Sequence, residues 1–196
     1  MVEGVSTTWL GDIETKPAPG ALRRVQGLIN TIDRESGQDR LANVDDARPW
    51  LVANGLLATD ALPAPDELRL LREVREALRG LIIHNTGGPV PAPTSTAPLR
   101  DIACEVAVRA AVESDGTVTL APVGDSVQAR LLGLLLVVQD AQRDGTWTHL
   151  KACANDDCLW AFYDRSRNHG GTWCDMASCG NKLKNRDFRA RQRAHQ

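Results

Sequence analysis

The stretch "CANDDCLWAFYDRSRNHGGTWCDMASCGNK" runs from Cys153 to Lys182 and holds four of the five cysteines of the chain. They form two pairs, Cys153 with Cys158 and Cys174 with Cys179, and four residues separate the members of each pair. Zinc takes four tetrahedral ligands, and thiolate sulfur suits it. Two short loops, each curling around one side of an ion, satisfy that geometry. The spacing therefore predicts one zinc ion per chain, bound by these four cysteines.

The residues around the two pairs predict the shape of this segment. "LWAFYD" alternates large side chains like a strand, "RSRNHGG" has the composition of a turn, and the residues after Cys179 have the composition of a helix. A knuckle, a hairpin and a helix whose start supplies the last two ligands describe a treble-clef-like zinc finger. So short a segment, with few aliphatic residues, buries too little surface to fold alone, and metal binding supplies the missing free energy.

Other uses of the cysteines stay open at this level. The four thiols could instead be ordinary or redox-active, with a switch that releases zinc on oxidation. His169 lies between the pairs and could replace a cysteine ligand, although we interpret it as a turn residue. The fifth cysteine, Cys104, lies in the apolar stretch "DIACEVAV". It is predicted to be a buried thiol that packs as a small hydrophobic residue.

Composition indicates a cytoplasmic protein. Of the 196 residues, 42% are hydrophobic, and the formal net charge is −2. The N-terminus lacks the basic start and apolar stretch of a secretory signal. The longest apolar run, Leu131–Val138, is far shorter than the roughly 20 residues that a membrane span needs. We therefore expect no membrane partner. In a reducing compartment, paired cysteines favour a metal site over disulfides.

The sequence changes character near residue 145. Residues 151–196 carry nine Lys or Arg and five Asp or Glu, which gives +4, whereas the preceding residues carry −6. Six of the eight aromatic residues follow residue 145. We therefore expect a helical domain over residues 1–145 and a zinc finger with a basic C-terminal helix over residues 146–196.

The first part is predicted to be mostly helical. Apolar residues recur at helical spacing from Leu22 to Ile32. A second helix is expected with Asp45 or Asp46 as its N-cap and Pro49 in its first turn. "APDELRLLREVREALRGLII" predicts a helix with an apolar stripe and charges on the opposite face. A further helix is expected from Asp125 to Arg143. "VAVRAAVESDGTVTLAPV" predicts a β-hairpin with a Ser-Asp-Gly turn. The predicted fold class is mainly α with a small β-hairpin.

The cysteine-rich stretch resembles the CGNR zinc finger, which follows an ABATE domain in a family of bacterial proteins described as stress-induced transcription regulators. "LINTID", "WLVANGL" and "LREVREALRGLI" resemble the N-terminal part of that family. Lys182 departs from it, because it stands where the family has the arginine that names the motif. "HGGT" also precedes Trp173 where the family tends to have basic residues. The motif residues in register are Cys153, Cys158, Asp164, Arg165, Ser166, Arg167, Asn168, Trp173, Cys174, Met176, Cys179, Gly180 and Asn181.

The segment after Cys179 predicts a cationic helix face. Its basic residues recur at helical spacing and could neutralise phosphates, with two arginines of the hairpin turn beside them. We expect a zinc-dependent, DNA-binding transcriptional regulator. The alternative function is an adaptor whose finger docks another protein, such as part of the transcription machinery. The basic residues could also belong to a C-terminal helix that is exposed to solvent and binds no partner. The expected nucleic-acid contacts are Arg165, Arg167, Lys182, Lys184, Arg186, Arg189 and Arg193.

The helical domain could sense a small-molecule effector, form a homodimer, or both. Asn30 and Thr31 are polar residues within an apolar-striped helix, so they either contact a ligand or pair with polar groups of the core. The sequence has no Ser/His/Asp arrangement, no phosphate-binding glycine loop and no open three-ligand metal site. We therefore expect that the protein is not an enzyme.

Overall fold

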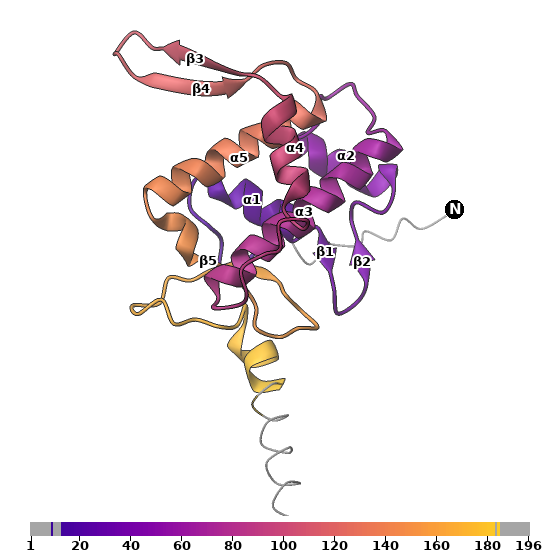
Figure 1. Cartoon of the computed structure of the whole chain (residues 1–196). Coiled ribbons are helices and arrows are strands. Elements are labelled where there is room, and N and C mark those ends of the chain that lie inside the picture. Colours follow the sequence, from indigo (N-terminus) through magenta and orange to yellow (C-terminus); the bar gives the residue numbers. More distant parts are fainter. Residues whose placement is uncertain (1–8, 10–12, 183, 185–196) are drawn as a thin grey trace, which may run out of the picture.

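The structure, a computed structural model, describes residue 9, residues 13–182 and residue 184. As predicted, it is mostly helical with small antiparallel strand pairs (Figure 1). The helices are α1 (Leu22–Ile29), α2 (Val44–Ala53), α3 (Pro65–Asn85), α4 (Ala97–Glu105) and α5 (Val127–Arg143), with a 3-10 helix, η2 (Thr146–His149), and a π-helical turn, η3 (Met176–Gly180). The strand pairs are β1 (Ile32–Asp33) with β2 (Gln38–Asp39), β3 (Val108–Val112) with β4 (Val118–Pro122), and β5 (Leu150–Ala152) with β6 (Ala161–Tyr163).

Helix α1 packs between α3 and α5 in the centre of the helical part. Its Val25, Leu28 and Ile29 are fully buried, as are Leu71 and Leu78 of α3. Complete burial of such a side chain contributes about 1.5–3 kcal/mol to folding. The core continues past residue 145, because Trp147, Leu150, Ala152, Ala161 and Tyr163 belong to the same buried cluster. The helices thus provide a fixed base for the segment that carries the cysteines.

Two helix boundaries differ from those expected. Helix α1 ends at Ile29 and Ile32 lies in β1, because the chain turns at Asn30 and Thr31 to enter the β1–β2 hairpin. Helix α2 is capped by Asn43 instead of Asp45 or Asp46. The Asn43 side chain accepts a hydrogen bond of 2.9 Å from the amide of Asp46. It thereby satisfies one of the free amides of the first turn.

Cys104 is exposed, so the prediction of a buried thiol is wrong. Helix α4 turns Leu99 and Ile102 toward the core. Cys104 lies about 200° around the helix from Ile102, at 100° per residue, and therefore faces away from the core. The apolar neighbours of Cys104 in sequence do not share its side of the helix.

The predicted hairpin is present as β3 and β4 and projects from the helical part (Figure 1). Gly116 adopts a φ of 83° in its turn, which a glycine tolerates without strain. Within the described part of the chain, no helix is long and apolar enough to cross a membrane.

Candidate metal centre and nucleic-acid interface

The first knuckle lies between β5 and β6. The backbone turns back on itself, since Asn155 O accepts hydrogen bonds from the amides of Cys158 (2.8 Å) and Leu159 (2.9 Å). Leu159 adopts a φ of 49°, a left-handed conformation that costs free energy for a non-glycine residue. The Cys153 amide donates to Trp160 O at 2.9 Å and closes the knuckle. These backbone hydrogen bonds bring Cys153 and Cys158 to one side of the site.

The second knuckle is formed by the turn η3. The Asp175 side chain accepts hydrogen bonds from the amides of Ala177 (3.3 Å) and Ser178 (3.0 Å), which caps the turn. Gly180 follows Cys179 in a crowded place. A Cβ atom there would lie 2.5 Å from Met176 Sδ and 2.6 Å from Trp173 Cδ1. The glycine of the "CGN" sequence is therefore required by packing against these two side chains.

The four thiols converge on one point. The four Sγ atoms of Cys153, Cys158, Cys174 and Cys179 all lie within 4.8 Å of one another. The Sγ–Sγ distances are 3.7 Å from Cys158 to Cys174 and 3.8 Å from Cys174 to Cys179. With zinc–sulfur bonds of about 2.3 Å, a tetrahedral site has sulfur–sulfur edges of about 3.8 Å. The cluster therefore fits one zinc ion.

Without a cation, neighbouring thiols favour the protonated forms of Cys158 and Cys174. Hydrogen bonding to Cys153, together with burial, raises the pKa of the Cys158 thiol to about 12. Hydrogen bonds to Cys153 and Cys158 also raise the pKa of Cys174. Zinc reverses this preference, because its charge stabilises thiolates and binding releases protons. Asn155 supports the site, since its Nδ2 lies 3.7 Å from Cys179 Sγ and can orient that ligand.

A buried ion pair organises the loop between the two knuckles. Lys151 Nζ lies 2.9 Å from Asp164 Oδ2, and both side chains are buried. Lys151 also donates to the carbonyls of His169 and Gly171. Burial by itself would raise the pKa of Asp164, but hydrogen bonds from Lys151, Ser166 and Gly171 outweigh it and hold the pKa below its ordinary range. His169 lies in this loop and is not part of the thiol cluster.

The expected nucleic-acid contacts are exposed where the structure describes them. Arg165 donates to Pro17 O at 2.9 Å, and its guanidinium lies 5.8 Å from the ring centre of Tyr163. Arg167 and Lys184 are exposed. Lys182 is exposed but is paired with both carboxylate oxygens of Glu35, at 3.2 and 3.1 Å. Arg186, Arg189 and Arg193 lie outside the described residues.

Asn30 and Thr31 pair with polar groups of the protein. Asn30 Nδ2 donates to Ala161 O at 2.9 Å, while Ala161 N donates to Asn30 Oδ1 at 2.8 Å. The amide side chain thus extends β6 as a neighbouring strand would. Thr31 Oγ1 donates to Leu28 O at 2.8 Å and accepts from Arg75 at 3.2 Å. These contacts agree with the alternative in which Asn30 and Thr31 pair with polar groups of the core and not with a ligand.

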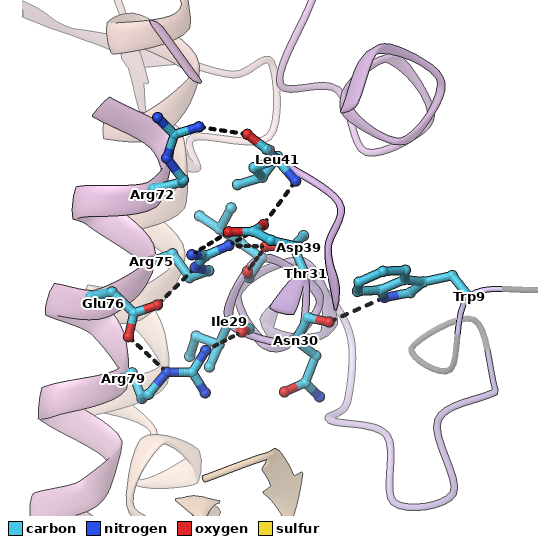
Figure 2. A network of polar contacts seen from close by, with 11 residues as sticks. Trp9, Ile29, Asn30, Thr31, Asp39, Leu41, Arg72, Arg75, Glu76 and Arg79 are labelled. Atoms are coloured by element: carbon cyan, nitrogen blue, oxygen red, sulfur yellow. Dashed lines mark hydrogen bonds and ion pairs between the residues drawn. The ribbon is translucent and has the colours of Figure 1, made fainter. Parts of the chain in front are cut away.

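The sequence did not reveal that two arginines of α3 are buried and connect distant parts of the chain. The charges of α3 were expected to face away from its apolar stripe, yet Arg75 and Arg79 are only 3% and 2% exposed. Arg75 forms an ion pair with Asp39 at 2.7 Å (Figure 2). Arg79 donates to Ile29 O and to Leu159 O, both at 2.7 Å, and so joins α1 to the first knuckle. The four-residue spacing of the arginines was the sequence signal, but it is also common on solvated faces.

Four thiols at tetrahedral spacing, held by two knuckles around a short hairpin, define a zinc-finger protein. Residues 149–192 match the CGNR zinc finger. Residues 22–147 match the ABATE family, described as "Putative stress-induced transcription regulator". The chain belongs to the ABATE family and carries a CGNR zinc finger. A comparison with curated proteins finds no match.

Proposed function

We propose that the protein is a zinc-dependent, DNA-binding transcriptional regulator in which the helical part holds the finger in a fixed orientation. The family description supports regulation. The observation that carries DNA binding is the set of exposed cations on the finger, Arg165, Arg167 and Lys184. Such side chains neutralise phosphates and release counterions. Arg165 is pre-oriented by Pro17 O, which lowers the entropy that a phosphate contact would cost.

We further propose that the zinc is structural and that the protein is not an enzyme. Four thiolates fill the coordination sphere of zinc, whereas catalytic zinc sites keep a position open for water or substrate. The knuckle backbones hold all four cysteines in place. The role of the metal is therefore to fix the hairpin turn that presents Arg165 and Arg167.

The variant Arg165→Ala/Arg167→Ala tests DNA binding. Loss of two phosphate contacts is expected to lower the slope of log affinity against log salt concentration by about two units, equally for all duplex sequences. The measurement is a fluorescence titration of random duplex DNA at two salt concentrations. Arg23→Ala/Arg69→Ala is the matched control, because it removes the same charge from exposed positions in α1 and α3. Equal loss in both variants, or wild-type binding without salt dependence, would refute the proposed contact.

The ion pair between Glu35 and Lys182 leads to a second expectation. Glu35 holds Lys182 with both carboxylate oxygens, so a phosphate must compete with it. Glu35→Gln is expected to raise affinity for duplex DNA about two- to fivefold, because one exposed pair contributes about 0.2–1 kcal/mol. The control is Asp60→Asn, which removes an exposed charge elsewhere. An unchanged or weaker affinity of Glu35→Gln, relative to that control, would exclude Lys182 as a phosphate contact.

One observation favours the adaptor as a second candidate. Glu35, Asp156 and Asp157 line a surface depression together with Arg34 and Lys182, so the surface beside Lys182 carries three carboxylates against two cations. Acidic side chains repel phosphates and suit a basic protein surface. An absence of DNA binding at low salt, with the zinc site intact, would support the adaptor over the regulator that binds DNA directly.

A further inference from the structure

The β3–β4 hairpin extends away from the helices, and every residue from 107 to 121 is exposed (Figure 1). Its five residue pairs alternate between two faces of the ribbon. One face consists of apolar residues only. The large side chains of this face are exposed to solvent. Their exposed fractions are 44% for Val108, 74% for Val112, 64% for Val118 and 48% for Leu120. Exposed strands of this kind are templates for pairing with another chain.

The two edges of the ribbon differ. Strand β4 packs beside α5, where Pro122 lies close to Gly133, and proline has no amide to donate. Strand β3 has no proline. The amide of Glu113 bonds to Thr117 O, and Ala107 O accepts from Val123, so the odd-numbered residues of β3 bond toward β4. By alternation, the amides and carbonyls of Val108, Ala110 and Val112 point outward from the ribbon.

We propose that this edge is a homodimer interface, in which β3 pairs antiparallel with β3 of a second copy about a twofold axis at Ala111. In this register Ala110 of one copy faces Val112 of the other, and their outward backbone groups form four hydrogen bonds. Arg109 of one copy faces Glu113 of the other, twice. Among the described residues Arg109 has no partner, and Glu113 uses only Oε1, which accepts from Thr119 at 3.1 Å.

Charge selects a second copy over nucleic acid. Residues 107–121 carry one arginine against Glu113 and Asp115, so the ribbon does not attract phosphates. The positions of Arg109 and Glu113 are symmetric about Ala111, which is what a twofold contact requires of one surface. In the antiparallel arrangement the tip of one hairpin lies beside the base of the other. Val112, near the tip, is more exposed than Val108, at the base. Because the shared strand is short, the dimer is weak, with a Kd of the order of 10 µM.

A charge exchange tests the register. Sedimentation equilibrium of the full, zinc-loaded chain should show a monomer–dimer equilibrium. Arg109→Glu places like charges opposite each other twice and should raise Kd by at least about tenfold. The exchange Arg109→Glu/Glu113→Arg restores both pairs and should return Kd to within about threefold of wild type. A wild type that stays monomeric at about 500 µM, or an exchange variant as weak as Arg109→Glu, would overturn the proposal.

Cross-linking provides a test that does not depend on affinity. Residues facing each other at a non-hydrogen-bonded antiparallel position have Cα atoms about 4.5 Å apart, within the range of a disulfide. In a Cys104→Ser background, which removes the exposed native thiol, Ala111→Cys should form a covalent dimer under mild oxidation. Thr119→Cys is the matched control, because Thr119 is the exposed neighbour of Ala111 on β4. Equal cross-linking of both variants, or none at Ala111→Cys, would contradict a twofold axis at Ala111.

Discussion

Removal of zinc with a chelator is expected to disorder the finger while most of the helical ellipticity remains. Structural zinc contributes about 10–16 kcal/mol to the folding of zinc-finger peptides near pH 7, so the knuckles cannot persist without it. Helix α1 keeps its contacts with α3 and α5. The measurement is circular dichroism for helix content, with the near-ultraviolet signal of Trp160 and Trp173 reporting on the finger.

The same treatment should lower the unfolding temperature of the helical part. Asn30 and Gln26 are buried and both donate to Ala161 O, and Asn30 Oδ1 accepts from Ala161 N, so disorder of β6 removes these hydrogen bonds and leaves Asn30 Oδ1 without its acceptor contact. A buried group left without a partner costs about 1–3 kcal/mol. Cys174→Ser should reproduce both effects and lose the single zinc equivalent in metal analysis. Loss of all helical signal would show that the two parts fold only together, whereas a folded finger without metal would contradict the zinc site.

Cys104→Ser is the matched control for the cysteine variants. Its thiol is exposed and lies outside the thiol cluster. It should keep one zinc per chain and change stability by less than about 0.5 kcal/mol, as is usual at exposed positions.

Asp164→Asn is expected to destabilise the protein by about 3–5 kcal/mol, because it leaves the buried Lys151 ammonium without its counter-charge. Asparagine keeps the shape of the side chain but cannot balance that charge. The loss should appear as a lower urea midpoint, followed by tryptophan fluorescence of the zinc-loaded protein. Asp157→Asn in the first knuckle is the control, because that carboxylate is exposed and should contribute little.

Replacement of both partners separates the charge effect from packing. Lys151→Met/Asp164→Asn removes the unpaired ammonium, so it should recover part of the stability lost in Asp164→Asn, although the carbonyls of His169 and Gly171 lose their donor. If Asp164→Asn costs no more than Asp157→Asn, the ion pair does not hold the hairpin loop. If the double variant is the least stable of the three, the packing of Lys151 outweighs its charge.

The sequence alone determined the features that depend on local pattern. Ligand spacing identified the four cysteines, because two short loops that each carry a pair of thiols can supply the four tetrahedral ligands of a structural zinc ion. Apolar periodicity placed the long helix α3, and β-branched residues on both sides of a Ser-Asp-Gly turn placed the β3–β4 hairpin, because both signals are encoded in consecutive residues. The same local information assigned the wrong environment to Cys104, whose apolar neighbours lie on another side of α4.

Only the tertiary structure decided how polar residues are used. Arg75 and Arg79 have the spacing of a solvated face, but Asp39, Ile29 O and Leu159 O reach them from distant parts of the chain. Lys182 belongs to a basic segment, yet it pairs with Glu35, 147 residues earlier. A buried or paired charge is stable only where partners converge in space, and those partners are far apart in sequence. Ligand spacing is local, whereas the compensation of charge depends on the complete fold.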